Sequence, residues 1–217
     1  MKMVSQSHTT TMFLFFTAFL FIFQSVAATV RYTPKQNTTT KDIYFIRKSC
    51  NMTEYPDVCF TSLSSYASAV HKSPGKLAKV SIAVSITKAK STAAYLSTLS
   101  RSANNNIISE CVSFVEDAKD DMKLSLRQLR SMLVEDAAGR RSGKTFRGLV
   151  DDVRTYLSSS LASEDTCIDG LEETGQEGVI KNKVSDSVNA LIRITSDALT
   201  LVTLYANNGA PPPPFSM

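Results

Sequence analysis

The strongest constraint on the fold is a helical period in the middle of the chain. Between residues 111 and 133, apolar side chains recur every three or four positions without a break. They are Cys111, Val115, Ala118, Met122, Leu126, Leu129 and Leu133. This spacing places all of them on one face of an α-helix, whereas Glu116, Asp120 and Arg127 fall on the opposite face. The segment is therefore predicted to be a long amphipathic helix with one buried side.

Three further segments repeat this period, over residues 77–99, 149–161 and 184–205. Asn-rich or Gly-containing breaks separate them, and no segment shows the apolar-polar alternation of a strand. The class is therefore all-α, and four long amphipathic helices predict an up-and-down four-helix bundle.

A shorter pair of helices is expected before the bundle. Asp42 is predicted to cap the first of them, and Tyr55-Pro56 breaks the chain before the second. The whole domain, an N-terminal α-hairpin extension followed by the bundle, is placed at residues 42–206.

The N-terminus has the layout of a secretory signal peptide. Lys2 precedes an apolar run from Met12 to Phe23, and small residues follow up to Ala28. The run is shorter than the roughly 20 residues that cross a bilayer, which disfavours the alternative of an uncleaved anchor. We expect residues 1–28 to be removed, and the mature protein to be secreted without membrane attachment.

Two flanking segments lack an apolar period. Residues 29–41 are predicted to form a flexible N-terminal arm, and residues 207–217, with Pro211–Pro214, a Pro-rich disordered tail. The sequon at Asn37 lies in the arm and is predicted to be glycosylated. A second sequon, at Asn51, is the less accessible candidate because a tight hairpin could hide it.

Four cysteines in a secreted chain imply two disulfides. Cys50, Cys59, Cys111 and Cys167 permit three pairings, of which the sequential one is the simplest because only eight residues separate the first two. On a loop-entropy argument the short bridge would stabilise the fold by about 3 kcal/mol and the long one by about 4 kcal/mol. Neither spacing resembles a zinc site, so no metal is expected.

No catalytic constellation stands out in the sequence. His71 is the only histidine of the mature chain and is expected to be exposed. The carboxylate pairs, including Asp151-Asp152 and Glu164-Asp165, are interpreted as solvated or helix-start charges. The acidic group after Cys111 does not start its helix, so a binding role competes there with simple solvation on equal terms. No enzymatic activity and no cofactor are expected.

The charge balance argues against a nucleic-acid binder. The net charge is +4, about +3 once Lys2 is removed, and the signs are mixed along the chain. The one dense basic run, residues 140–144, contains glycine and is interpreted as an exposed loop.

Several motifs together resemble the plant invertase and pectin methylesterase inhibitor family, over about residues 42–205. They are Cys50-x-x-Thr53-x-Tyr55-Pro56-x-x-Cys59, then Cys111 followed by Asp117-Ala118-Lys119-Asp120, then Asp152-Val153-Arg154-Thr155-Tyr156-Leu157-Ser158, and then Asp165-Thr166-Cys167-Ile168-Asp169-Gly170. The resemblance implies a four-helix bundle with an N-terminal α-hairpin and the pairing Cys50–Cys59 and Cys111–Cys167. It also implies a monomer that inhibits a cell-wall enzyme in a 1:1 complex.

The resemblance assigns the enzyme contact to Asp117, Asp120 and Asp169, with Thr166 beside the bridge. Such inhibitors cover the pectin-binding cleft, so pectin methylesterase is the expected partner. The Cys111–Cys167 bridge is expected to bring the three carboxylates near one another on a rigid surface, which lowers the entropy cost of binding. The family often has Glu and Tyr where this chain has Ser113 and Val115, a departure that bears on target range.

Other functions compete with this interpretation. Acid invertase is the alternative target, but the Pro-Lys-Phe motif of that branch is absent, since Gln36 follows Pro34-Lys35. The inhibitory pro-region of a pectin methylesterase is a third option, and no catalytic domain follows here, which favours a stand-alone inhibitor. More distant alternatives are a carrier of a small apolar ligand between the helices and a structural wall protein.

Overall fold

The computed structural model describes residues 40–103, 105–137, 145–173 and 178–209, and these residues contain helices and no strand. The elements in chain order are α2 (Thr40–Cys50), α3 (Pro56–Leu63), the 3-10 helix η1 (Ser64–Tyr66), α4 (Ala67–Val70), α5 (Pro74–Ala103), α6 (Asn106–Ala137), α7 (Phe146–Glu173) and α8 (Val179–Gly209). The predicted all-α class is confirmed.

The predicted boundaries shift slightly at both ends of the domain. Helix α2 begins at Thr40, inside the expected N-terminal arm, and α8 continues to Gly209, beyond the expected end at residue 206. The predicted signal peptide, the sequon at Asn37 and the basic run at residues 140–144 lie outside the described residues, as does the tail from residue 210.

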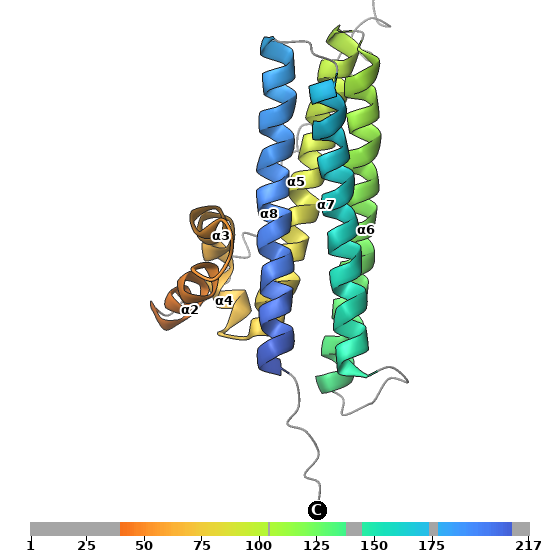
Figure 1. Ribbon diagram of the computed structural model, residues 1–217. Coiled ribbons are helices and arrows are strands. Elements are labelled where there is room, and N and C mark those ends of the chain that lie inside the picture. The colour runs from red at the N-terminus through yellow and green to blue at the C-terminus, as the bar shows by residue number, and fades with distance from the viewer. Residues whose placement is uncertain (1–39, 104, 138–144, 174–177, 210–217) are drawn as a thin grey trace, which may run out of the picture. The chain divides into compact units, whose positions relative to one another are not determined.

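The four long helices, α5 to α8, stand side by side as a bundle (Figure 1). Each packs against the next, and α8 also packs against α5, which closes the ring. The helices are amphipathic and bury their apolar stripes in one shared core, with Leu96, Met122, Leu157 and Leu191 fully buried. The face predicted on α6 is confirmed, except that Leu133 is only partly buried.

Helices α6 and α7 pack with a seven-residue repeat of small side chains. Cys111 is bonded to Cys167, the Ser160 hydroxyl donates to the Ala118 carbonyl at 3.0 Å, and the Ser125 hydroxyl donates to the Val153 carbonyl at 3.1 Å. Each step moves seven residues forward on α6 and seven back on α7, so the two helices are antiparallel. The small residues let the backbones approach closely, to a Cα–Cα distance of 4.7 Å at the disulfide.

Polar residues mark the starts of the bundle helices. The Asn105 Oδ1 atom accepts hydrogen bonds from the backbone N–H groups of Ile107 and Ile108 at 3.0 and 3.3 Å before α6. Thr145 accepts one from Gly148 at 3.2 Å at the start of α7. These caps satisfy donors that the first helical turn leaves unpaired, which explains where the chain begins each helix.

The α2–α3 hairpin has a small core of its own. Ile46, Leu63 and Val70 pack with Leu77 of α5 and Leu201 of α8, which attaches the hairpin to the lower half of the bundle (Figure 1). The Cys50–Cys59 disulfide joins the two hairpin helices, so the sequential pairing is confirmed for both bridges. Asp42 is not the N-cap residue of α2 as expected, because the helix begins at Thr40 and Asp42 lies inside its first turn.

Candidate functional site

The four residues proposed for partner contact all lie on the outer surface of α6 and α7. Asp117 and Asp120 are one turn apart on α6. Thr166 and Asp169 lie on either side of Cys167 near the end of α7, and all four residues are exposed. Their helices are pinned by the Cys111–Cys167 disulfide. The sites are therefore held on rigid elements and not on loops.

The antiparallel register separates Asp169 from the other two carboxylates. Asp117 lies six residues after Cys111 on one helix, and Asp169 lies two residues after Cys167 on the other, so they fall on opposite sides of the bridge along the bundle axis. Along the bundle axis, Asp169 lies about 12 Å from Asp117 and about 16 Å from Asp120. The expectation that the bridge gathers the three carboxylates was wrong, because it ignored helix direction. They are spread along the bundle axis over about 16 Å, and this set of three is called the strip below.

The carboxylates in and beside this strip differ in their electrostatic surroundings. Lys123 donates to Asp120 Oδ1 at 2.7 Å, and this hydrogen bond holds the pKa of Asp120 below its usual value. Partial burial, and then the charge of Asp169, raises the pKa of Asp165. Asp120 therefore stays ionised at lower pH than Asp165 does.

Acidic residues concentrate at the disulfide end of α6 and α7. Helix α7 carries seven acidic and two basic residues, and four of the acidic ones, Asp165, Asp169, Glu172 and Glu173, lie near or beyond Cys167. Because α6 runs the other way, its early residues Glu110 and Glu116 lie at this same end. The strip thus belongs to a broader anionic surface, referred to below as the acidic face.

Glu164 corrects the interpretation of the carboxylate pairs. It is fully buried at the α7–α8 contact, where the Thr195 hydroxyl donates to its Oε1 atom at 2.9 Å. Burial raises the pKa of Glu164 to about 8, against a smaller lowering by the Thr195 hydrogen bond. The sequence did contain the signal, because Glu164 continues the buried series Leu157, Ser160, Cys167.

A polar contact between the hairpin and α8 was missed by the sequence reasoning. Asp197, which is 2% exposed, accepts a hydrogen bond from the backbone N–H of Tyr55 at 3.0 Å. The Ser196 hydroxyl donates to Glu54 Oε2 at 2.8 Å, and the Arg193 guanidinium lies 5.5 Å from the centre of the Tyr55 ring. These contacts hold the hairpin tip against α8. No local pattern in the sequence connects residues so far apart.

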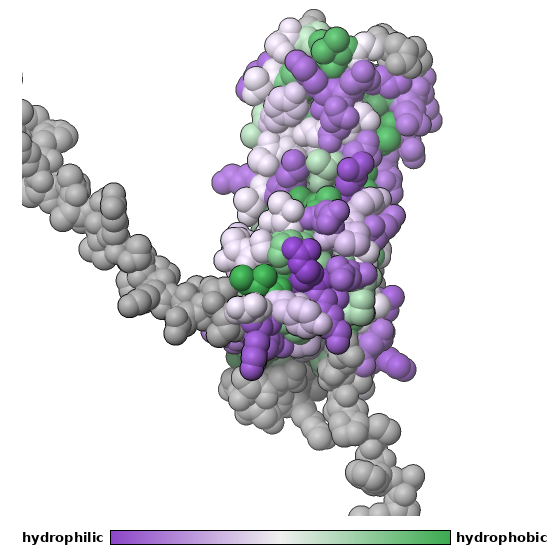
Figure 2. Space-filling model, turned by 90° about the vertical axis from the view of Figure 1, so that its left-hand side faces the viewer, coloured by the Kyte–Doolittle hydropathy of each residue, from purple (hydrophilic) through white to green (hydrophobic). Residues whose placement is uncertain are grey.

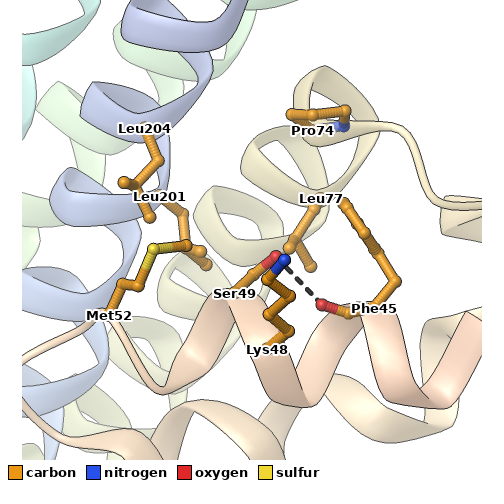
Figure 3. Close-up of a pocket in the computed structure, with 8 residues that line it drawn as sticks. All are labelled: Phe45, Lys48, Ser49, Met52, Pro74, Leu77, Leu201 and Leu204. Carbon is orange, nitrogen blue, oxygen red and sulfur yellow. Dashed lines mark hydrogen bonds between the residues drawn. The ribbon is translucent and has the colours of Figure 1, made fainter.

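Among the described residues, no dominant apolar patch is visible on the hairpin side (Figure 2). Figure 2 shows hydrophobic residues there as separate spots among hydrophilic ones. A groove of about 400 Å³ opens where α2 meets the start of α5 and the end of α8 (Figure 3). Its lining consists of Phe45, Lys48, Ser49, Met52, Pro74, Leu77, Leu201 and Leu204. This groove lies at the hairpin, so it is not the cavity between bundle helices that an apolar-ligand carrier was expected to need.

The described residues offer little for catalysis or metal binding. His71 is exposed at the end of α4, as expected. No group of three or more His, Cys, Asp or Glu side chains in this part of the chain could hold a metal ion. No helix within the described ranges is long and apolar enough to span a bilayer.

The described residues form a disulfide-pinned helical bundle with an attached hairpin and an anionic face. The family model described as "Plant invertase/pectin methylesterase inhibitor" matches residues 44–201, and the chain belongs to this family. The family consists of inhibitors and not enzymes, so the expectation of an inhibitor is confirmed at this level.

Full-length relatives agree with the family assignment. The chain is 34% identical to pectinesterase inhibitor 4 of Arabidopsis thaliana, over 84% of this chain and 89% of that protein. It is 31% identical to pectinesterase inhibitor 11 of the same plant, over 89% and 96%. A 21 kDa protein of Daucus carota is 32% identical over 75% and 83%.

A solved structure supports the fold. The crystal structure of a mutant form of a pectin methylesterase inhibitor from Arabidopsis matches with a TM-score of 0.54, covering 71% of this chain and 93% of that chain. The sequence identity is 17%, so this likeness concerns the architecture.

Proposed function

We propose that this protein is a secreted inhibitor of pectin methylesterase and that it binds the enzyme through the acidic face. The observation that carries the proposal is family membership together with relatives named pectinesterase inhibitors that align along most of the chain. The position of the acidic face on two disulfide-linked helices adds physical support.

In this proposal the bundle acts as a rigid block. Asp117, Asp120, Thr166 and Asp169 contact the rim of the pectin-binding cleft, and the bundle excludes the polymer in a 1:1 complex. Rigid helices lose little conformational entropy on binding, so less of the favourable contact free energy is offset by an ordering cost. The strip of about 16 Å fits an elongated contact along a groove better than insertion into a narrow pocket.

Inhibition assays with matched variants test the proposed surface. The oxidised mature protein is titrated against a pectin methylesterase while methanol release is followed, and saturation near one equivalent is expected. Asp117→Asn with Asp120→Asn should raise the inhibition constant about tenfold, because charge pairs across an interface are lost. The control is Asp57→Asn with Asp186→Asn, which changes the net charge equally at exposed positions on α3 and α8.

The outcomes discriminate between target and surface. Equal weakening in both double variants would exclude the acidic face as the docking site while keeping the target. An invertase assay in parallel covers the second target in the family description, and inhibition of invertase alone would move the proposal to that enzyme.

Secretion and glycosylation are part of the proposal. Asn51 is exposed at the hairpin tip, which removes the earlier objection that the hairpin hides it. The Thr53 hydroxyl of the same sequon donates to the Cys50 carbonyl at 2.9 Å, so glycan transfer has to precede hairpin closure. Faster migration of Asn51→Gln than of the wild type on a denaturing gel would establish that Asn51 carries a glycan, and equal migration would exclude it.

A further inference from the structure

The outer side of α5 is strongly basic. Its thirty residues contain no acidic residue and carry Lys76, Lys79, Lys88, Lys90 and Arg101. Lys79, Lys90 and Arg101 are spaced by eleven residues, or three helical turns, and therefore share one face about 33 Å long. Lys76, three residues before Lys79, extends it to about 38 Å.

Helix α6 adds two arginines beside this strip. A Cβ atom at Gly75 would lie 2.7 Å from Leu133 Cδ2, so the start of α5 directly faces the end of α6. Lys79 lies one turn after Gly75 on α5, and Arg130 lies one turn before Leu133 on α6. Because the two helices are antiparallel, both steps lead in the same direction along the bundle. Arg127 follows Arg130 on an exposed part of α6. These two arginines and the four α5 residues Lys76, Lys79, Lys90 and Arg101 are called the basic face below.

The side chains of the basic face differ in their pairing from the lysines further along α6. Within the described residues, none of its six side chains makes an ion pair, whereas Lys119 and Lys123, further along α6, pair with Glu116 and Asp120. Lys79 is partly buried and the other five are exposed. Ala83, Thr87, Ala94 and Thr98 lie between the α5 cations, so the strip is flat and has small side chains.

We infer that the basic face binds an anionic polysaccharide with one carboxylate on each sugar ring, which is de-esterified pectin. A strip of separated cations without a concave pocket suits an extended polyanion better than a small anion, because each cation contacts a different repeat. Arginine guanidinium groups also match carboxylate geometry with two parallel hydrogen bonds.

The choice of polymer rests on the proposed function. Removal of methyl esters by the proposed target exposes carboxylates, so the product of the reaction carries the charge that the basic face recognises. Binding would concentrate the inhibitor where de-esterification has already advanced. Nucleic acids and anionic membranes are the competing polyanions.

Affinity electrophoresis through gels that contain polygalacturonate tests the inference. In 50 mM NaCl at pH 6, the wild-type protein should be retarded by polygalacturonate and not by highly methyl-esterified pectin. The variant Lys79→Gln, Lys90→Gln, Arg101→Gln should bind the polymer at least about fivefold more weakly, because three polyanion contacts are lost. The control Lys48→Gln, Arg147→Gln, Lys183→Gln loses the same charge from exposed positions on α2, α7 and α8 and should behave as wild type.

Three results would overturn the inference: no retardation of the wild type, equal weakening in both triple variants, or tighter binding to anionic phospholipid vesicles or to DNA than to polygalacturonate. Thermal unfolding of each variant confirms that the surface changes leave the fold intact. Inhibition of pectin methylesterase is measured on the same samples and should be unchanged in the triple variant of the basic face. A wild-type protein that binds the polymer and inhibits no esterase would refute the proposed function alone.

Discussion

Glu164 makes the stability of this protein depend on pH. Its pKa of about 8 in the folded state lies above the ordinary value of 4.5 because of burial. Between these values the folded state keeps a proton that the unfolded state releases, so the free energy of unfolding falls as pH rises from 4.5 to 8. The fall is on the order of 1 kcal/mol per pH unit within this window.

Glu164→Gln removes this titration while keeping an acceptor for the Thr195 hydroxyl. We expect the variant to gain stability over wild type as pH rises, by roughly 2 kcal/mol at pH 6.5, and to differ little at pH 4. Urea unfolding at these two pH values measures the difference. Glu172→Gln, at an exposed position of the same helix, is the control and should track wild type. Parallel pH profiles for Glu164→Gln and wild type would show that Glu164 is ionised in the folded state.

Single residues were predicted less well from sequence than their helices were. The exposure of Asp117, Asp120 and Asp169 agreed with the sequence pattern, since polar residues opposite an apolar stripe face water. Glu164 was misassigned because residue type was weighed above helical position. The distance between Asp117 and Asp169 depends on the antiparallel order of α6 and α7, which the predicted up-and-down bundle already implied.

At the scale of elements, the buried contact between Asp197 and Tyr55 contributes to docking of the hairpin. Asp197→Ala leaves the Tyr55 N–H without its acceptor, at a cost of about 1–3 kcal/mol, whereas Asp197→Asn retains an acceptor oxygen. We expect faster hydrogen exchange in α2 and α3 of the alanine variant, with α6 and α7 unchanged. The asparagine variant should stay near wild type. Uniformly faster exchange across all helices would mean that hairpin and bundle unfold as one unit.

Close packing of α6 on α7 requires small side chains at the repeat. Ala118 is fully buried where the Ser160 hydroxyl reaches its carbonyl, so Ala118→Leu should force the helices apart and destabilise the fold by about 1–3 kcal/mol. Ala162→Leu makes the same change at an exposed position of α7 and should have little effect. Thermal unfolding compares the two variants. Equal melting temperatures would show that the contact between α6 and α7 has room for a larger side chain.

The elements themselves followed closely from the sequence. The three-to-four residue period set the four long helices, and the Asn and Gly breaks lie within a few residues of their ends, whereas Pro56 marks the start of α3. The attachment of the hairpin to α8 could not be predicted in this way. It depends on Tyr55 and Asp197, which are 142 positions apart, and on apolar residues that would fit a helix in any arrangement.

On the scale of the whole molecule, the two signs of charge are distributed unevenly between the helices. The net charge is only +4, yet α5 carries no acidic residue and α7 carries seven. A small net charge gives weak long-range attraction to any partner, so recognition has to come from the two faces. At physiological salt, charges interact over about 8 Å, which is slightly less than the roughly 10 Å of α6 that separates Asp120 of the acidic face from Arg127 of the basic face.

This spacing predicts separate salt responses for the two proposed ligands. Between 50 and 300 mM NaCl, both polygalacturonate binding and esterase inhibition by the wild-type protein should weaken as ions screen the contacts. The triple variant of the basic face should have a shallower salt slope for the polymer only. Asp117→Asn with Asp120→Asn should have a shallower slope for the enzyme only. The triple variant lowers the net charge, whereas the double variant raises it. If either variant changed the salt slopes for both ligands, the overall charge and not the separate faces would govern binding.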